Sequence, residues 1–163
     1  LSASGKTTIA DAFERALHES RLRTCILDGD NLRQGLNKDL GFVEADRIEN
    51  NRRVAEVAKL MIDTGLIVIA ALISPFKSGR DAARAIFEKG DFVEVYIDAP
   101  LDVVEKRDPK GLYKKARNGE IPNFTGIDSS YEVPEQPEVH LRTAELTVEQ
   151  SVQRLIEYLN ARL

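Results

Sequence analysis

The sequence predicts a single α/β domain over residues 1–163, with a parallel sheet covered by helices on both faces. The chain has the length of one compact domain and contains no repeat or linker that would divide it. Short runs rich in Ile, Val and Leu alternate with longer segments of helical periodicity. Strands and helices that alternate in this way form right-handed crossovers, which make the strands parallel.

Four apolar runs are the predicted strands. They lack strict alternation of apolar and polar residues, which is typical of parallel strands buried on both faces. The four runs are Leu22–Asp28, Leu66–Ser74, Phe92–Asp98 and Val139–Thr143. The longest uninterrupted apolar run, residues 66–73, is much too short to cross a bilayer, so no membrane partner is expected.

Helical periodicity accompanies these strands. In Glu44–Thr64, small and branched apolar residues recur on one face, whereas Arg52 and Arg53 fall elsewhere and are interpreted as solvated surface. The last helix is predicted to begin at Thr147, whose spacing to Gln150 is that of a capping box.

The charge and cysteine content exclude some classes of protein. The formal net charge is −4, so no general basic field attracts nucleic acid, and anionic ligands must be held by local clusters of Arg and Lys. The single cysteine, Cys25, excludes an intramolecular disulfide and fits a reducing compartment. We therefore expect a cytoplasmic protein.

The first eight residues, LSASGKTT, match the end of the phosphate-loop pattern G-x-x-x-x-G-K-[ST] if a glycine precedes Leu1. Gly5 permits a turn in which successive N–H groups converge on a phosphate, and the amphipathic segment Thr8–Glu19 supplies the following helix. Lys6 carries charge to the β- and γ-phosphates, and the Thr7 hydroxyl is placed to ligate Mg²⁺. The residues expected to contact the nucleoside triphosphate are Ser2, Ala3, Ser4, Gly5, Lys6, Thr7 and Thr8.

The alternative interpretation of this segment is a helix start rich in small residues with a chance Gly-Lys-Thr. The surrounding α/β pattern favours the phosphate loop. We therefore expect an apolar strand ending in glycine directly upstream of Leu1.

Two carboxylates follow the first predicted strand, in Asp28-Gly-Asp30. Ligands of open α/β sheets bind beyond the carboxyl ends of strands, so a phosphoryl acceptor is expected here. One carboxylate can accept the proton of an attacking hydroxyl, while the other orients water on Mg²⁺. The alternative is a polar turn in which either aspartate caps a helix. The phosphate loop upstream favours the chemical interpretation.

Further polar residues are candidates for binding an anion. Arg47 and Asn50 are three residues apart and share a helix face, from which arginine can fork onto an anion; a solvated charged surface is the alternative. Pro75 ends the second predicted strand and leaves Ser74 at the mouth of the sheet.

Residues 108–138 interrupt the pattern of strands and helices and predict a mobile lid, too polar and too broken to be core. Basic residues at its start would neutralise phosphate and exclude water on closing. They are Arg107, Lys110, Lys114, Lys115 and Arg117. An exposed basic helix is the alternative for Lys114 and Lys115. Phe124 lies in a polar segment and is expected to contact something flat rather than fill a core.

Seven segments occur in the order and spacing of adenylyl-sulfate (APS) kinases, and the sequence resembles this family over essentially its whole length. They are SASGKTT, LDGDNLR, LGF, DRIENNRR, ISPF, RDPKGLYKKAR and NFTGIDSSYE. KGLYKKAR and FTGID are specific to this family rather than to P-loop kinases in general. The resemblance implies a P-loop kinase fold and an ATP- and Mg²⁺-dependent phosphorylation of the ribose 3′-hydroxyl of APS.

The resemblance also implies roles for individual residues. Asp30 is the implied base for the 3′-hydroxyl, Asp28 lies near the metal, and Arg107 lies beside the base of ATP. Phe42 and Phe124 are implied to sandwich the acceptor adenine. The implied APS contacts are Asp30, Arg33, Phe42, Arg47, Asn50, Ile73, Ser74, Lys110, Asn123 and Phe124.

Direct in-line transfer is expected rather than a phosphoserine at Ser74, because no sequence neighbour would activate that hydroxyl. Two alternative identities, and the domain's context, stay open. Another small-molecule kinase with this fold is one alternative. A non-catalytic regulatory module, as in some fungal ATP sulfurylases, is another, although the intact Gly5, Lys6 and Thr7 favour catalysis. Family members are commonly homodimers, and fusion to an ATP sulfurylase is neither indicated nor excluded.

Overall fold

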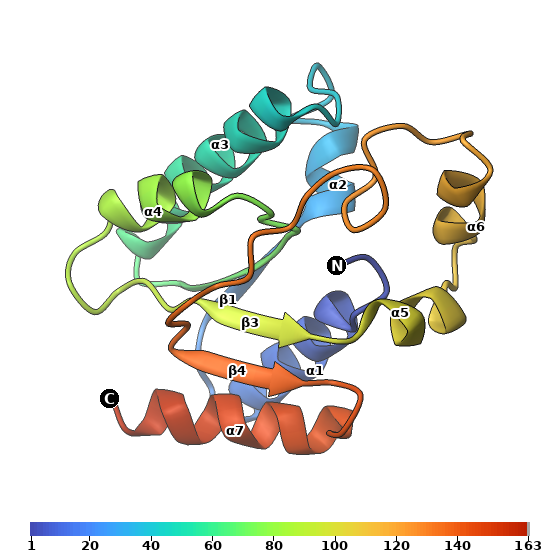
Figure 1. The fold of residues 1–163 in the computed structure, drawn as a ribbon. Coiled ribbons are helices and arrows are strands. Elements are labelled where there is room, and N and C mark those ends of the chain that lie inside the picture. The colour runs from blue at the N-terminus through green and yellow to red at the C-terminus, as the bar shows by residue number, and fades with distance from the viewer. Residues whose placement is uncertain (163) are drawn as a thin grey trace.

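The computed structural model describes residues 1–162 as alternating helices and short strands (Figure 1). In chain order the elements are α1 (Lys6–Glu19), β1 (Thr24–Asp28), α2 (Gly29–Gln34), α3 (Glu44–Ile62), β2 (Ile67–Ala71), α4 (Lys77–Ala85), β3 (Val95–Asp98), α5 (Leu101–Arg107), α6 (Leu112–Arg117), β4 (Val139–Arg142) and α7 (Val148–Asn160). All four predicted strands are present, each shorter than its apolar run.

The strands pair in parallel, as predicted. β1 pairs with β2 from Thr24 opposite Ile67 onward, and β3 pairs with β4 from Val95 opposite Val139 onward. Within residues 1–162, no ladder joins the two pairs, so the single continuous sheet expected from the sequence is replaced by two two-stranded sheets. An apolar run indicates that a strand is buried, but it does not specify which strands are neighbours.

Helices cover the strands on both sides. Figure 1 shows α3 and α4 above the strands, α7 below them and α1 behind β3 and β4. On the lower side, Ile9 of α1 and Leu155 of α7 pack with Leu141 of β4. On the upper side, Leu27 of β1 packs with Val54 of α3. The predicted layering of helices on both faces is confirmed.

Local signals set several helix boundaries. The predicted capping box is present at the start of α7, where the Gln150 N–H donates to the Thr147 hydroxyl (3.2 Å) and the Thr147 N–H donates to the Gln150 side chain (2.9 Å). These bonds satisfy N–H groups that the first helical turn leaves unpaired.

No helix in residues 1–162 combines the length and the apolar character that crossing a membrane requires.

The lid segment, residues 108–138, is more firmly packed than its sequence indicated. Tyr113 of α6 is only 2% exposed and packs with Val104 of α5. Its hydroxyl donates to the Ser2 carbonyl (3.1 Å). The expectation that this segment is too polar to join a core is therefore wrong at Tyr113, because an aromatic ring with one hydroxyl can be buried once that hydroxyl has a partner.

Candidate active site

The phosphate-loop segment, residues 1–8, makes a tight turn into α1. Gly5 has φ of +99° and caps the helix, a left-handed conformation that glycine adopts without steric cost. Ala3 also has a positive φ, of +55°. Ser4 is fully buried and its hydroxyl donates to the Leu1 carbonyl (2.9 Å). The unpaired N–H groups at the start of a helix favour an anion at this point.

Lys6 folds back over this turn. Its ammonium donates to the Leu1 carbonyl and lies 3.5 Å from the Ser4 hydroxyl. Burial lowers the pKa of Lys6 to about 8, and the nearby carboxylates of Asp30 and Asp28 oppose that shift. Partial burial makes an ammonium a stronger partner for phosphate than it is in bulk water.

Asp28 connects the phosphate-loop segment to α2. The Thr7 hydroxyl donates to one oxygen of its carboxylate (3.2 Å). The other oxygen accepts the N–H groups of Asp30 (3.0 Å) and Asn31 (3.2 Å). Asp28 therefore caps α2, as the alternative interpretation expected, and the same side chain also contacts the phosphate-loop segment.

Asp30, in the first turn of α2, forms an ion pair with Lys110 at the start of the lid. Both side chains are mostly exposed, at 70% and 63%. The carboxylate of Asp30 raises the pKa of Lys110 through this contact. Of the basic residues predicted at the lid, Lys110 thus reaches the carboxylate of Asp30, whereas Lys114 and Lys115 are exposed, as their alternative interpretation expected.

The Thr7 hydroxyl and the Asp28 carboxylate fit the ligand requirements of Mg²⁺. This ion prefers oxygen ligands, keeps several waters and is commonly held by one or two protein groups together with phosphate. Within residues 1–162, no cluster of three or more His, Cys, Asp or Glu side chains could hold a metal by itself. The site therefore suits a cation bound largely through a nucleotide and water.

Two arginines border the ring of Phe42, which is 52% exposed. The guanidinium of Arg33 lies 4.4 Å from the ring centre, and that of Arg47 lies 5.4 Å away. Arg33 donates to the carbonyls of Leu40 (3.2 Å) and Gly41 (2.8 Å). The result is an aromatic surface with positive charge beside it.

Arg47 is almost fully buried, at 8% exposed. It donates to the Phe42 carbonyl (2.9 Å) and, across the site, to the Asn123 carbonyl (2.8 Å). Burial lowers the pKa of Arg47, and the charge of Arg33 lowers it further. The alternative of a solvated arginine on α3 is therefore wrong for Arg47, which joins α3 to the lid.

The remaining predicted acceptor residues lie around this surface. Asn50 is buried and its side-chain oxygen accepts a bond from Asn37 (3.0 Å). Phe124 meets the ring of Tyr113 edge-on, with ring centres 4.9 Å apart, and packs against the core beneath the lid. The expectation that Phe124 would contact something flat rather than fill a core is therefore wrong in part, because its ring packs against the buried Tyr113. The N–H groups of Asn123 (2.8 Å) and Phe124 (2.5 Å) donate to Asp128.

Ser74 and Ile73 follow β2 and are partly buried. The Ser74 carbonyl accepts a hydrogen bond from Arg80 of α4 (2.7 Å).

Arg107 donates to the Thr143 hydroxyl (3.2 Å) and carbonyl (2.6 Å). The Thr143 hydroxyl in turn donates to the Ser4 carbonyl (2.8 Å), which connects Arg107 to the phosphate-loop segment.

Sequence reasoning missed several residues that shape this site. Thr143, Asn37 and Arg80 act through hydrogen bonds that their local sequence does not indicate. Asp128 was missed as well, although its place within the FTGID string was a signal that could have identified it.

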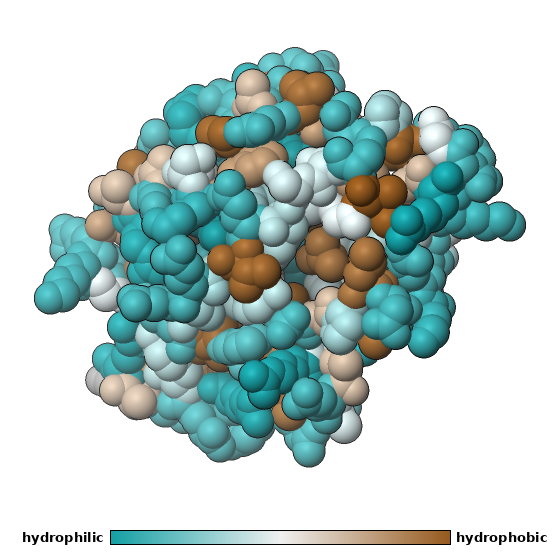
Figure 2. Space-filling view, in the orientation of Figure 1, coloured by the Kyte–Doolittle hydropathy of each residue, from teal (hydrophilic) through white to brown (hydrophobic). Residues whose placement is uncertain are grey.

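A cavity of about 470 Å³ lies beside the phosphate-loop segment. Figure 2 shows hydrophobic side chains around a hollow on this face. Its apolar lining consists of Leu1, Ile97, Ala99, Leu101, Ile127 and Val133. Lys6, Asp28 and Asp30 are not among the residues that line this cavity.

Comparison with known proteins identifies the family. The family model described as adenylylsulphate kinase matches residues 1–142. The adenylyl-sulfate kinase of Clostridium acetobutylicum is 61% identical over 159 residues, which cover 98% of this chain and 79% of that protein. The bifunctional enzyme NodQ of Rhizobium sp. (strain N33) is 58% identical over 162 residues, which cover 99% of this chain but only 25% of NodQ.

The fold comparison agrees. The structure of the Mycobacterium tuberculosis APS kinase CysC, in complex with AMPPNP and APS, superposes with a TM-score of 0.94 and 48% identity. The match covers 98% of this chain and 93% of that one. Motifs, site geometry, sequence and fold lead to one assignment, and the chain belongs to the adenylylsulphate kinase family.

Proposed function

We propose that this protein transfers the γ-phosphoryl group of ATP to the ribose 3′-hydroxyl of APS, producing ADP and 3′-phosphoadenosine 5′-phosphosulfate (PAPS). The observation that carries the proposal is the position of Asp30. It follows the Asp28 that bonds to Thr7 of the phosphate-loop segment, and it pairs with Lys110 of the lid. A carboxylate between a nucleotide loop and a cationic lid is where an acceptor hydroxyl would be activated.

In this proposal Ser2, Ala3, Ser4, Gly5 and Thr8 cradle the phosphates of ATP, and Lys6 supplies positive charge to the β- and γ-phosphates. Thr7 and Asp28 would hold Mg²⁺, which neutralises charge on the phosphates when it is bound. The Asp30 carboxylate accepts the proton of the 3′-hydroxyl as the new oxygen–phosphorus bond forms. The bond between the γ-phosphorus and the bridging oxygen breaks in line, and ADP leaves.

The acceptor would stack its adenine between Phe42 and Phe124. The half-exposed Phe42 ring and the Arg33 guanidinium 4.4 Å from it support this assignment, because stacking needs an open aromatic face and phosphosulfate needs positive charge. Contacts from Arg47, Asn50, Ile73, Ser74, Lys110 and Asn123 would complete the acceptor site, and Arg107 would lie toward the base of ATP.

We further propose that the protein acts in the cytoplasm as a homodimer and that its substrate is supplied by an ATP sulfurylase. The single free cysteine, Cys25, supports a reducing compartment. The bifunctional NodQ relative supports a close link to a second activity, because this chain corresponds to only 25% of NodQ. Light scattering on the purified protein would measure the number of subunits.

The test is to incubate the full-length protein with APS and MgATP and to follow ADP and PAPS together. Equal formation of both products, lost in Lys6→Ala, supports the kinase. AMP in place of APS serves as the control acceptor, and turnover with AMP alone would mean that the acceptor site is misassigned. Nucleotide binding without transfer would instead indicate the regulatory module.

A further inference from the structure

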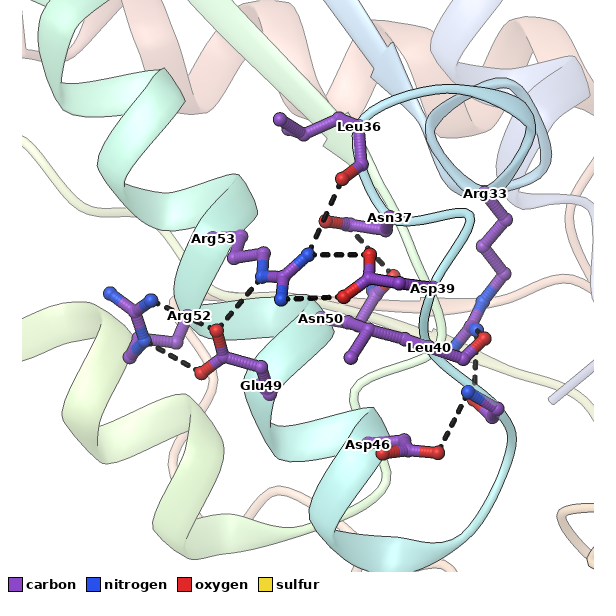
Figure 3. Close-up of polar contacts among 11 residues, drawn as sticks. Arg33, Leu36, Asn37, Asp39, Leu40, Asp46, Glu49, Asn50, Arg52 and Arg53 are labelled. Carbon is purple, nitrogen blue, oxygen red and sulfur yellow. Dashed lines mark hydrogen bonds and ion pairs between the residues drawn. The ribbon is translucent and has the colours of Figure 1, made fainter.

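The loop that carries Phe42, residues 35–43, is fastened to α3 by polar contacts, among them those of Arg53, which is not one of the substrate contacts proposed above. Figure 3 shows these polar contacts, with Arg53 reaching from α3 to the loop. The loop connects α2 to α3 through turns rather than a helix or strand. Besides the bonds that Arg33 and Arg47 donate to its carbonyls, these contacts hold its position.

Arg53 and Asp39 form a two-pronged contact between α3 and the loop. The two guanidinium N–H groups donate to the two carboxylate oxygens at 2.8 and 2.9 Å, a two-pronged geometry that fixes orientation as well as distance. Arg53 is itself held by Glu49 of the same helix (2.8 Å) and also donates to the Leu36 carbonyl (3.4 Å). The guanidinium of Arg53 lowers the pKa of Asp39 through this hydrogen bonding.

Two further contacts pin the loop on either side of Asp39. Asn37 is fully buried and donates to the Asn50 side chain (3.0 Å). The Gly41 N–H donates to the carboxylate of Asp46 (2.7 Å). A Cβ at position 41 would lie 2.7 Å from that same oxygen, so a larger residue there would displace the Asp46 carboxylate.

These contacts bear on Phe42, the next residue in the chain. An exposed aromatic ring on a free loop would gain by folding against nearby apolar surface. Here the backbone is held just before Phe42, and the ring stays 52% exposed. A ring already held in place lowers the ordering cost of binding a flat ligand.

We infer that Arg53, acting through Asp39, is a positioning residue that holds Phe42 ready to stack on the acceptor base. This inference rests on the proposed function, because it assigns the base to Phe42. Arg53 does not itself touch the acceptor in this scheme. Its effect is confined to the acceptor half of the reaction, so ATP binding is independent of it.

The chain offers a matched control in the adjacent arginine. Arg52 lies on the same helix and pairs with the same Glu49 (2.8 Å), but its other partner is Glu56 of α3 (3.5 Å), and none of its contacts reach the loop. Removing Arg52 changes the charge and the ion pairing of α3 and leaves the Asp39 contact intact. Only Arg53 tests the fastening of the loop.

The experiment compares Arg53→Ala with Arg52→Ala. We expect Arg53→Ala to raise KM and Kd for APS about tenfold while KM for ATP changes by less than about twofold, and Arg52→Ala to leave all three within about twofold. Amide hydrogen exchange of residues 35–43 should accelerate in Arg53→Ala and not in Arg52→Ala. If Arg53→Ala does not fold, Arg53→Lys provides the test, because it keeps the charge but loses the two-pronged contact. It should weaken APS binding in the same direction.

A double-mutant cycle isolates the contact. Asp39→Ala combined with Arg53→Ala should be no worse for APS than Arg53→Ala alone, since both remove one interaction. Faster exchange of the loop with unchanged KM and Kd for APS would overturn the inference, as would an equal loss in Arg52→Ala.

The two proposals fail separately. If the wild-type protein binds APS without transferring phosphate, the kinase assignment fails, and the Kd comparison between Arg53→Ala and Arg52→Ala still decides the role of Arg53. If the wild-type protein does not bind APS at all, both are overturned.

Discussion

The Thr7 hydroxyl donates a hydrogen bond of 3.2 Å to the Asp28 carboxylate, which joins the first turn of α1 to the end of β1. The second oxygen of that carboxylate caps α2 and so sets the position of Asp30. One side chain therefore relates the phosphate-loop segment to the proposed base. Replacement of Asp28 can separate its structural role from its chemical one.

Asp28→Asn should lower kcat about 100-fold while leaving the protein folded. Asparagine caps helices as well as aspartate does, so α2 should remain in place. The lost negative charge should also raise the Mg²⁺ concentration needed for half-maximal activity. Steady-state kinetics and thermal unfolding measure the two effects. Activity within about threefold of wild type would mean that Asp28 serves only as a cap.

Ser74→Ala should weaken APS binding but retain turnover, whereas Lys6→Ala and Asp30→Ala should largely abolish it. The Ser74 contact in the structure is made by its carbonyl, which accepts from Arg80 (2.7 Å) and persists in alanine. Direct transfer requires no serine nucleophile. Initial rates at saturating ATP and varied APS provide the measurement. A folded Ser74→Ala protein as inactive as Lys6→Ala would contradict direct transfer.

Thr143→Val should raise KM for ATP and lower the free energy of unfolding by about 1–2 kcal/mol, because the buried Ser4 carbonyl loses its donor. The Thr143 hydroxyl makes that bond at 2.8 Å and is the group that Arg107 contacts. Urea unfolding and ATP-dependent kinetics would measure both effects. Thr64→Val is the control, since this exposed hydroxyl also donates to a carbonyl (2.7 Å, Met61) but lies away from the site.

The sequence predicted best what depends on local patterns. The capping box at Thr147 and the parallel direction of the strands follow from spacing and composition. The order of strands does not, because an apolar run carries no information about its neighbour. Tyr113 was assigned to a polar lid because its neighbours are charged, yet the ring is buried once its hydroxyl finds the Ser2 carbonyl.

Site residues divide in the same way. Lys6, Asp28 and Asp30 were predicted from motifs whose spacing indicates phosphate binding and proton transfer. Arg53 was interpreted as surface, as was Arg52, and only the folded chain distinguishes them by bringing Asp39 to Arg53. Such partners are set by tertiary structure, so neither periodicity nor charge pattern could have separated the two arginines.

The carboxylate of Glu138, which precedes β4, should make the free energy of unfolding depend on pH in acid. It accepts two hydrogen bonds from Arg84 of α4 (2.6 and 2.8 Å) and one from the Glu94 N–H (2.7 Å). The Arg84 contact is the main reason that the pKa of Glu138 falls from its usual 4.5 to about 2. The folded state therefore favours the ionised form.

The sign of the pH dependence follows from that shift. A carboxylate whose pKa is lowered by folding stabilises the protein fully above its unfolded pKa, and this contribution is lost as pH falls toward the folded pKa. At pH 7, Glu138→Gln should therefore be less stable than wild type by about 2 kcal/mol, the scale of hydrogen bonds to a charged group. The difference should shrink as pH falls from 4.5 toward 2. Urea unfolding followed by circular dichroism at several pH values measures it, with Glu145→Gln, at an exposed position, as the control. A difference between wild type and Glu138→Gln that stays constant across this range would show that the ion pair with Arg84 does not govern the titration.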